Sequence, residues 1–578
     1  MSKNIVICCD GTSNSPTDQE DGKPCPTNVW KFYDALLSSA DSNWKQIGFY
    51  DAGVGSGTSS ASRALDKAAA LLSSFGKFGT ILGKIFGTGN RLFEAGTGTG
   101  IRENILDGYS AIVRLYQPGD RIFLIGFSRG AYTARCIGGL IRKAGLLKAE
   151  NARYAPDLVK LYVNRRPKTS VRLREGLCHE NSTVNIAFIG VWDTVASLGL
   201  PLWGWWFRPL GFGSNEGYRD THPVACDLAC HAMSMDEKRS QFFVTPFDEN
   251  PTTKDKSERP KQIEQRWFRG THAGVGGGYA DEALSNIPLL WMIERATSQG
   301  LLFDVGKTTA IKANPLGDVH DELVRKPFWQ AFGSWPRWFP CNRPQDSNNL
   351  PGYSGFGIID SSVMIRAQNA FRQRFQSTAV HPEELCWLDL GQSVEIQVEA
   401  SRPWNRSGVV LEPGGIYRID YCPQSGGRWR DKEEDECGPE GQANVGFVRE
   451  RLKYAKRAPK AHWFELMAYV AVPQSWPLIE KSMGELLKLL LVADPKGLTD
   501  QYLRLGDQMV STQNGNALSA VIQMEPDSPA GMFYTFANDH WLFYGNNSGA
   551  LKLLITRIDA PSEFKPIRLG TTSVVFRP

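Results

Sequence analysis

The side chains that could do chemistry in this sequence are a serine, an acid and a histidine, in that order along the chain. Ser128 is the central residue of Gly-Phe-Ser-Arg-Gly, which fits the pattern G-x-S-x-G. Asp193 directly follows a long apolar run, and His272 stands in a glycine-rich segment. In serine hydrolases a histidine takes the proton of the nucleophilic serine, and an acid orients the imidazole. The three residues in this order therefore predict nucleophilic hydrolysis of an ester.

The segment around Ser128 has the context that a nucleophile elbow requires. Residues 121–125 form a short, mostly apolar run typical of a buried strand, and the residues after the elbow show helical spacing up to Gly145. Gly126 and Gly130 allow a sharp turn that exposes the serine Oγ. An ordinary tight turn is the alternative, because glycine and serine are common in loops. The strand before and the helix after favour the elbow.

Backbone N–H groups near the elbow could stabilise the negative charge that develops on an ester carbonyl oxygen. The elbow supplies the N–H of Arg129 at the start of the predicted helix. A second donor could come from Gly11 or Thr12, which closely follow the predicted strand 4–9. That loop could instead be a turn in which Asp10 caps local amides, and a phosphate site is disfavoured because a Walker lysine is missing. We expect an oxyanion hole formed by Arg129 with Gly11 or Thr12.

The acid and the histidine both follow predicted buried strands. Residues 184–192 form the strand before Asp193, and Gln265–Phe268 form the strand before the loop of His272. Open α/β sheets hold their functional groups at the C-terminal ends of strands, although Asp193 could also cap its own loop. A histidine on a glycine-rich loop can reach the serine. His231 is a poorer candidate, because it lies in a predicted helical run.

Composition argues against several other classes of function. The net charge of +4 is too small to indicate nucleic-acid binding. The 11 cysteines are odd in number and scattered, which does not fit a disulfide framework. Cys226, Cys230 and His231 lack a second pair of ligands, so we expect neither a metal nor another cofactor. The first residues do not resemble a signal peptide and no long apolar run occurs, so we expect secretion without a cleaved leader and no membrane span.

Two inserted segments have the composition of surfaces that contact membranes. The insertion 55–94 combines apolar residues at helical spacing with basic residues, and the insertion 198–212 holds three Trp and two Phe in a loop broken by Pro and Gly. A third insertion, 328–341, is also aromatic. The alternatives are a helix packed on the core and a lid packed over the site. The residues expected to contact a membrane are Leu72, Phe75, Phe78, Leu82, Phe86, Trp203, Trp205 and Trp206.

The order of the predicted elements indicates an α/β fold in two parts. Residues 1–385 are predicted to form a catalytic domain like the α/β-hydrolases, with a mostly parallel sheet and the three insertions. Residues 386–578 are predicted to form a β-rich accessory module, a sandwich with a helical insertion at 449–492. The Trp, Asn and Asp residues of this module could bind carbohydrate or a protein partner, or they could serve as ordinary turn residues.

Several motifs together resemble one protein family. They are Cys-Asp-Gly-Thr near the start, Gly-Phe-Ser-Arg-Gly-Ala-Tyr-Thr-Ala-Arg, Val-Trp-Asp-Thr-Val, and His-x-x-Val-Gly-Gly-Gly-Tyr. This combination resembles the bacterial type VI secretion lipase effectors, in the subfamily with a G-x-S-x-G nucleophile, over residues 1–295. The resemblance implies an α/β-hydrolase core with Ser128, Asp193 and His272 as the catalytic triad. The family commonly has Asp two residues after the histidine, where this chain has Gly274.

The resemblance also implies a substrate and partners. Such effectors are phospholipases that cleave acyl esters of glycerophospholipids, here expected to be of A2 type with A1 as the alternative. The family implies a type VI spike protein as carrier, a cognate immunity protein, and action at the membrane in the periplasm of a target bacterium. Two other hypotheses stay open: a soluble serine esterase acting on small esters, and a non-catalytic effector that binds glycan or protein.

Overall fold

The computed structural model of the chain contains two compact units. The first comprises Met1–Asp236, Gln241–His320 and Ser354–Gly357, and the second comprises Glu237–Ser240, Asp321–Tyr353 and Ile358–Pro578. The second unit thus includes residues before 385 that the sequence analysis assigned to the catalytic domain. The residues that the structure describes are 2–11, 16–37, 46–52, 101–163, 176–180, 183–195, 224–239, 242–249, 259–326, 329, 334, 336–343, 356–374, 384–432, 434–442, 456–458, 460–471, 502–512, 514–539, 544–560 and 564–569.

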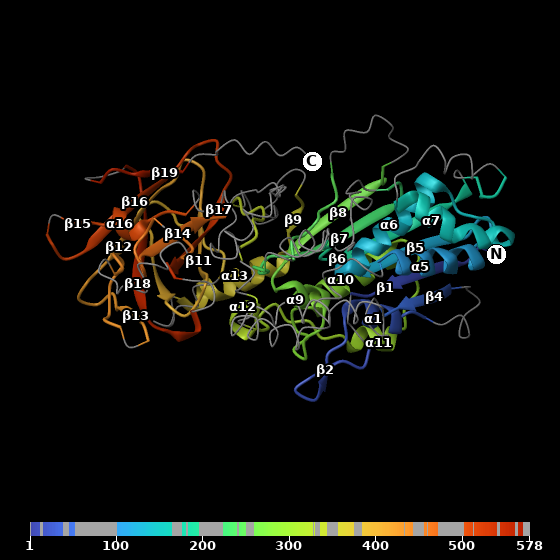
Figure 1. The fold of residues 1–578 in the computed structure, drawn as a ribbon, viewed down its shortest axis with the longest axis horizontal. Coiled ribbons are helices and arrows are strands. Elements are labelled where there is room, and N and C mark those ends of the chain that lie inside the picture. Colours follow the sequence, from blue (N-terminus) through green and yellow to red (C-terminus); the bar gives the residue numbers. More distant parts are fainter. Residues whose placement is uncertain are drawn as a thin grey trace, which may run out of the picture. The chain divides into compact units, whose positions relative to one another are not determined.

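The strands of the first unit form a parallel sheet in the order β4-β1-β5-β6-β7-β8 (Figure 1). The interior strands β1, β5 and β6 are nearly continuous apolar runs, because interior strands of a parallel sheet are buried on both faces. The predicted α/β class is therefore confirmed. The strands are β1 (Asn4–Cys9), β4 (Gln46–Asp51), β5 (Arg121–Phe127), β6 (Asn185–Trp192), β7 (Leu228–Ser234) and β8 (Gln262–Phe268).

Helices cover both faces of this sheet. Along β1, Ile5 and Ile7 belong to one apolar cluster and Val6 and Cys8 to another, because successive side chains of a strand point to opposite faces. The first cluster includes side chains of α5 (Ile101–Leu115), α6 (Ser128–Ala144) and α7 (Ala155–Val163); the second includes those of α1 (Asn28–Asp34) and α10 (Asn286–Ser298). The result is a three-layer α/β/α arrangement.

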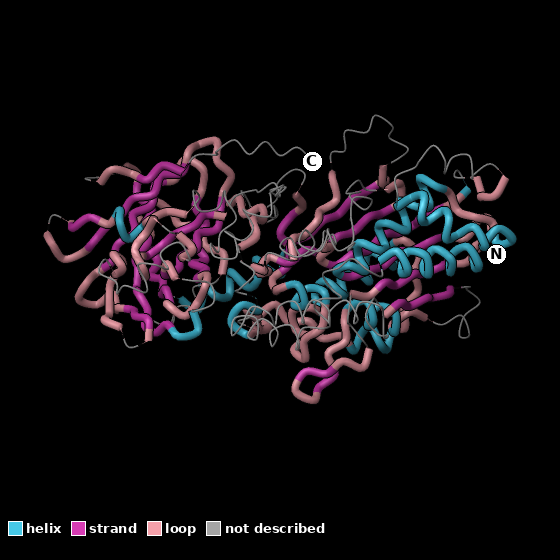
Figure 2. Tube along the Cα trace, in the orientation of Figure 1, coloured by secondary structure: helices cyan, strands magenta, loops and turns pink. Residues whose placement is uncertain are grey.

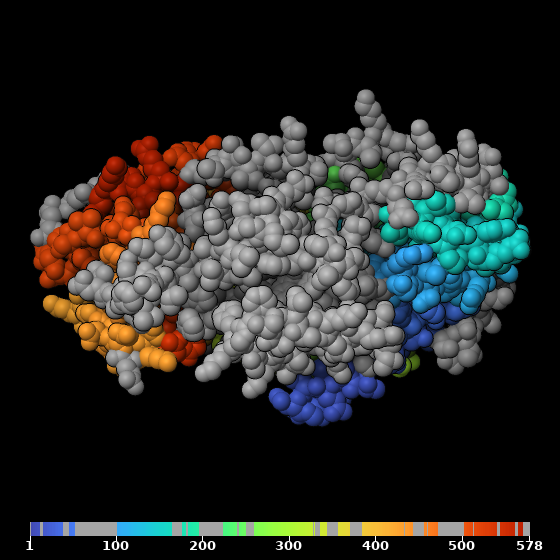
Figure 3. All heavy atoms as spheres, in the orientation of Figure 1, coloured from blue at the N-terminus to red at the C-terminus, as the bar shows by residue number. Residues whose placement is uncertain are grey.

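The remaining elements of this unit are short. The hairpin β2–β3 lies at the surface (Figure 3). These elements are β2 (Gln19–Glu20), β3 (Lys23–Pro24), the 3₁₀ helix η2 (Ala149–Tyr154), α9 (His272–Gly276) and α11 (Val305–Ala310).

The order of the strands creates a topological switch point between β1 and β5. From β1 the chain continues to β4 on one side, and it then passes through α5 to β5 on the other side of β1. Binding sites of open α/β sheets form at the carboxyl ends of the strands at such a point. The loop after β1 holds Gly11, and the elbow with Ser128 directly follows β5. The topology therefore brings both predicted segments to the same edge of the sheet.

The second unit consists mostly of strands (Figure 2), and most of its strand pairs are antiparallel. One sheet has the order β10-β18-β12-β16-β15, with β13 paired to β18 and β19 to β16, and another has the order β11-β17-β14. Inward side chains of both sheets share one apolar cluster, which is the packing of a β-sandwich. The elements are α12 (Glu322–Arg325), β9 (Ile358–Ile359), α13 (Ser361–Arg374), β10 (Ser393–Glu399), β11 (Asn405–Leu411), β12 (Ile416–Tyr421), β13 (Trp429–Asp431), β14 (Leu466–Val470), α16 (Leu505–Gln508), β15 (Val510–Ser511), β16 (Leu518–Met524), β17 (Gly531–Ala537), the 3₁₀ helix η10 (Tyr544–Asn546), β18 (Asn547–Ile558) and β19 (Ile567–Leu569).

Two local predictions differ from the structure, and a third segment can now be placed. His231 lies in strand β7 and not in a helix, because its neighbours are buried between β6 and β8. The helical prediction for 449–492 is wrong over Leu466–Val470, which form β14, and most of the rest lies outside the described residues. Within the aromatic insertion 328–341, Trp329 and Phe339 are buried in the second unit, so these side chains form part of a core.

Candidate active site

The structure brings the three predicted site residues into one chain of hydrogen bonds. His272 Nε2 lies 2.8 Å from Ser128 Oγ, and His272 Nδ1 lies 2.6 Å from Asp193 Oδ2. Asp193 is fully buried and His272 is nearly so, whereas Ser128 is partly exposed. The imidazole therefore stands between a buried carboxylate and an accessible hydroxyl, which is the geometry that lets a histidine accept the proton of a nucleophile.

The elbow holds Ser128 in a conformation that is unfavourable for this residue. Ser128 has φ = +57°, a left-handed value that costs an L-residue roughly 1–2 kcal/mol. A Cβ at Gly126 would collide with the backbone of Gly130, and a Cβ at Gly130 would collide with the carbonyl of Cys9. Only glycine fits at these two positions, so the strand can turn at once into α6. The predicted strand before Ser128 and the predicted helix after it are confirmed as β5 and α6, and Gly145 is the C-cap of α6.

Asp193 is fixed by the ends of the neighbouring strands. Phe127 pairs with Trp192 in the sheet, so Ser128 and Asp193 follow neighbouring positions of β5 and β6. The Asp193 N–H donates to the Ala232 carbonyl at 2.7 Å, and Asp193 Oδ1 accepts the N–H of Ser234 at 2.9 Å. One carboxylate oxygen is thus held by β7, and the other faces the imidazole.

His272 is the first residue of the short helix α9, which replaces the predicted open loop. Its ring packs between Phe127 and Phe242, with ring centroids 4.6 and 4.8 Å away. These contacts hold the ring in place beside the serine. Because Asp193 supplies the acid for Nδ1, the geometry needs no carboxylate at Gly274, where the family commonly has Asp.

Sequence reasoning missed the residues that hold the acid and the histidine segment together. The Ser234 hydroxyl donates to the Gly270 carbonyl at 2.7 Å, and Asp236 Oδ2 accepts the Gly270 N–H at 2.7 Å. His231 Nε2 accepts the Thr194 N–H at 3.0 Å, directly after the acid. His231 and Ser234 lie in β7 and Asp236 follows it by two residues, and none of the motifs in the sequence analysis pointed to Ser234 or Asp236.

Two of the predicted oxyanion donors, Gly11 and Arg129, follow β1 and β5, the strands on either side of the switch point. Arg129 is in the first turn of α6, where N–H groups have no acceptor inside the helix. The N-cap residue of α6 is Phe127, whose side chain makes no capping hydrogen bond. The Gly11 N–H donates to Asp10 Oδ1 at 2.6 Å, so the turn-capping alternative describes this amide in the structure. Thr12 lies outside the described residues. The oxyanion role of these amides stays a prediction.

Asp10 is itself firmly held. Its Oδ2 accepts hydrogen bonds from the Thr27 hydroxyl at 2.5 Å and from the Tyr50 hydroxyl at 2.7 Å. Burial raises the pKa of the Tyr50 hydroxyl, and the negative charge of Asp10 raises this pKa further. Tyr50 therefore stays protonated and donates to Asp10. This network fixes Asp10 and Gly11 next to the elbow, where the Asp10 carbonyl lies close to Gly130.

A pair of glycines in α9 offers a test of how tightly this region is packed. A Cβ at Gly276 would overlap the ring of Phe127, whereas a Cβ at Gly274 would lie 3.6 Å from Thr271 Oγ1, an ordinary contact. We expect Gly276→Ala to lower the free energy of unfolding by about 1–3 kcal/mol and to reduce activity by displacing the ring that packs on His272. Gly274→Ala is the matched control and should change stability by less than about 0.5 kcal/mol. Urea unfolding measures both, and equal stability of the two variants would contradict the packing argument.

Several predicted features lie outside the described residues. These include all of the residues expected to contact a membrane, in 53–100 and 196–223. Among the helices that the structure describes, none is long and apolar enough to cross a membrane. The described residues also hold no cluster of three or more side chains that could bind a metal. Cys226 and Cys230 belong to apolar clusters on opposite faces of the sheet, and burial raises the pKa of the Cys226 thiol to about 12.

Comparison with known proteins gives a family and a few relatives. The family model described as "T6SS, Phospholipase effector Tle1-like, catalytic domain" matches residues 3–295, which is more than half of the chain. An uncharacterized protein of Saccharomyces cerevisiae is 28% identical over 260 residues, which cover 43% of this chain and 33% of that protein. This chain therefore spans about a third of the length of that curated relative.

Two solved structures are also similar. One is the crystal structure of an uncharacterized protein from Pseudomonas aeruginosa, with 19% identity, a TM-score of 0.32, and coverage of 57% of this chain and 50% of that chain. The other is the Tle1 effector bound to the VgrG spike of the type VI secretion system, with 16% identity and a TM-score of 0.30. The match covers 58% of this chain and 81% of that chain.

Proposed function

We propose that this chain, which belongs to the Tle1-like phospholipase effector family of the type VI secretion system, hydrolyses acyl esters of glycerophospholipids with Ser128 as nucleophile. One observation carries the proposal. The hydroxyl of Ser128, the imidazole of His272 and the buried carboxylate of Asp193 form a continuous chain of hydrogen bonds at the carboxyl edge of the parallel sheet.

The first half of the reaction forms an acyl-enzyme. His272 Nε2 takes the proton of Ser128 Oγ as this oxygen attacks the ester carbonyl carbon. Asp193 keeps the proton on Nδ1 and stabilises the imidazolium that forms. The N–H of Arg129, at the positive end of α6, donates to the carbonyl oxygen as it becomes negative. The second donor is the N–H of Thr12, or that of Gly11 after it has left Asp10 Oδ1. His272 then gives its proton to the leaving alcohol oxygen, and the ester bond breaks.

The second half releases the fatty acid. A water molecule gives a proton to His272 Nε2 and attacks the acyl-enzyme carbonyl, and the histidine returns this proton to Ser128 Oγ as the acyl–serine bond breaks. Both halves use one base and one oxyanion site. The products are a lysophospholipid and a fatty acid.

We further propose that the enzyme is of A2 type, so that the fatty acid comes from the sn-2 position. The test uses vesicles of a phospholipid with different acyl chains at sn-1 and sn-2, and mass spectrometry of the products. The expected result is release of the sn-2 chain and accumulation of the sn-1 lysophospholipid, with neither product formed by Ser128→Ala. Release of the sn-1 chain would change the assignment to A1.

Other outcomes of the same experiment would overturn the proposal. Loss of the head group with both acyl chains retained would exclude acyl-ester hydrolysis. Turnover of short-chain esters without turnover of vesicles would favour the soluble esterase. No turnover and no labelling of Ser128 by a serine-directed phosphonate would favour a non-catalytic effector.

The family also supports a proposal for delivery. We propose that a type VI spike protein carries the chain, that it acts at the membrane in the periplasm of a target bacterium, and that a cognate immunity protein protects the producer. A related Tle1 effector has been solved with the VgrG spike. Expression directed to the periplasm of a test bacterium should be toxic, and expression confined to the cytoplasm should not. Equal growth in both cases would contradict action in the periplasm.

A further inference from the structure

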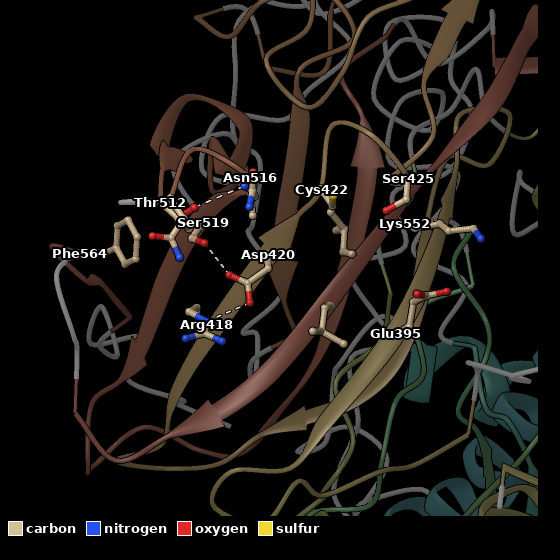
Figure 4. Close-up of a pocket in the computed structure, with 15 residues that line it drawn as sticks. Glu395, Arg418, Asp420, Cys422, Ser425, Thr512, Asn516, Ser519, Lys552 and Phe564 are labelled. Atoms are coloured by element: carbon tan, nitrogen blue, oxygen red, sulfur yellow. Dashed lines mark hydrogen bonds and ion pairs between the residues drawn. The ribbon is translucent and has the colours of Figure 1, made fainter. Parts of the chain in front are cut away.

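A pocket of about 650 Å³ with both polar and apolar lining opens on one sheet of the second unit (Figure 4). This volume lies in the range of small-molecule sites. The floor of the pocket is a row of residues that face one another across four strands. The register pairs Glu395 with Leu554, Leu554 with Asp420, and Asp420 with Ser519. The pocket is therefore formed by neighbouring positions of β10, β18, β12 and β16.

The carboxylate at the centre of the row is held in a fixed orientation. Asp420 Oδ2 accepts from Arg418 Nε at 2.9 Å, and Asp420 Oδ1 accepts from the buried Ser519 hydroxyl at 2.5 Å. Figure 4 shows Asp420 between these two donors. A side chain fixed in this way loses little conformational entropy when a ligand binds, which favours recognition.

The walls of the pocket offer both donors and acceptors. The hairpin between β15 and β16 places Asn514 and Asn516 on the pocket, and the hairpin is closed by hydrogen bonds between Thr512 and Ala517. The exposed side chains of Lys552 and Glu395 lie at the side opposite Thr512 (Figure 4). Each amide side chain carries donor and acceptor groups together.

The charges of the pocket balance. The lining of the pocket holds two cations, Arg418 and Lys552, and two carboxylates, Asp420 and Glu395. A phosphate or another strong anion would lie against both carboxylates, and a cation would lie against both basic groups. A neutral ligand avoids either repulsion. Hydroxyl groups suit such a mixture because each hydroxyl can donate and accept at once.

The pocket also has apolar surface among its polar groups. Leu554 is 39% exposed in the middle of the floor, and Phe564 lies at the Thr512 side of the pocket. The C–H faces of a sugar ring can pack on such surfaces while its hydroxyls bond to the walls. We propose that this pocket binds a neutral carbohydrate, with Asp420 as its central acceptor and the two asparagines as its walls. This site is separate from the hydrolytic one and does not depend on the proposed reaction.

Cys422 provides a test that uses the unmodified protein. It lines the pocket and is partly exposed, whereas the other ten cysteines are buried. Hydrogen bonds from the Ser425 hydroxyl and from the N–H groups of Gln424 and Ser425 lower the pKa of the Cys422 thiol, which favours its alkylation. The full chain is treated with N-ethylmaleimide in the presence of maltose, cellobiose, lactose or inorganic phosphate, and alkylation is followed by peptide mass spectrometry.

The expected result is that at least one disaccharide slows alkylation of Cys422, about tenfold at a concentration of about ten times its Kd. Asp420→Asn should weaken binding of that sugar by about tenfold or more, because a hydrogen bond to a charged acceptor is lost. At the same sugar concentration, alkylation should then be slowed by no more than about twofold. Glu399→Gln is the matched control: Glu399 accepts from Arg402 Nε at the same 2.9 Å but does not line the pocket. Ser128→Ala should bind the sugar with the wild-type affinity. The test of the pocket therefore gives the same answer whether or not the proposed hydrolysis is correct.

Three outcomes would overturn the carbohydrate assignment. The first is that no disaccharide protects Cys422. The second is that inorganic phosphate protects it as well as a sugar does, which would make the pocket an anion site. The third is that the sugar protects Cys422 equally well in Asp420→Asn and in Glu399→Gln, which would mean that Asp420 does not contact the sugar. The first two use the wild-type chain and do not depend on the folding of any variant.

Discussion

Replacing Ser128 with alanine is expected to lower kcat for phospholipid hydrolysis by at least about 10⁴-fold. The variant keeps the pair of His272 and Asp193 but removes the oxygen that would form the acyl-enzyme. Alanine has the same Cβ as serine and meets the same left-handed backbone cost, so the elbow should keep its shape. The measurement is the initial rate of fatty-acid release from vesicles over a range of lipid concentrations. KM should change much less than kcat, because the lost step is chemical.

Ser298→Ala is a matched control for this variant. Ser298 lies at the end of α10, and its hydroxyl donates to the Arg295 carbonyl at 2.6 Å in the same helix. Its loss should leave both kcat and KM at the wild-type values. A Ser128→Ala enzyme with unchanged turnover would contradict the nucleophile assignment, provided that its thermal unfolding matches that of the wild type.

Much of the first unit follows from local signals in the sequence. The strands β1, β5 and β6 are apolar runs with many β-branched residues, and such runs in parallel sheets are buried on both faces. The elbow could be predicted because its glycines, its serine and the change of periodicity all lie within a few residues. The order of serine, acid and histidine added a chemical constraint that local propensity does not contain.

Strand β7 shows where local signals fail. Its sequence Leu-Ala-Cys-His-Ala-Met-Ser is rich in residues that favour helices, and the sequence prediction followed that preference. In the fold the segment is buried between β6 and β8, and the hydrogen bonds of both neighbours require an extended chain. The same reason applies to β14, Leu-Met-Ala-Tyr-Val, which pairs with β17. Pairing with neighbouring strands determines the secondary structure of such segments, and a single sequence does not show which strands will pair.

The supporting contacts of the site were hidden for the same reason. Ser234 reaches both the acid and the backbone of Gly270 only because β6, β7 and β8 are neighbours in the sheet. Similarly, Gly276 must be small because Phe127, far away in the sequence, packs against it. The residues that perform a reaction can be recognised by type and order. The residues that hold them in place can be recognised only from their contacts in the folded chain.

The contact between Ser234 and Asp193 leads to the second large prediction, for Asp193→Asn. The Ser234 N–H needs an acceptor, so the carbonyl oxygen of the new amide should face Ser234. The amide NH₂ must then point at His272 Nδ1, which lies 2.6 Å from the other carboxylate oxygen in the wild type. This arrangement makes Nδ1 an acceptor and leaves the proton on Nε2, so the imidazole cannot take the proton of Ser128. We expect kcat to fall by about 10⁴-fold with little change in KM.

Two measurements separate this tautomer effect from a loss of structure. Nitrogen NMR of the histidines should show the proton of His272 on Nδ1 in the wild type and on Nε2 in the variant, because the partner of Nδ1 changes from an acceptor to a donor. Asp227→Asn is the control: its carboxylate pairs with the exposed Lys261 at 2.7 Å, and such surface pairs contribute about 0–1 kcal/mol. This control should keep full activity. If Asp193→Asn kept the wild-type tautomer and yet lost activity, a change of tautomer could not explain the loss, and this prediction would be wrong.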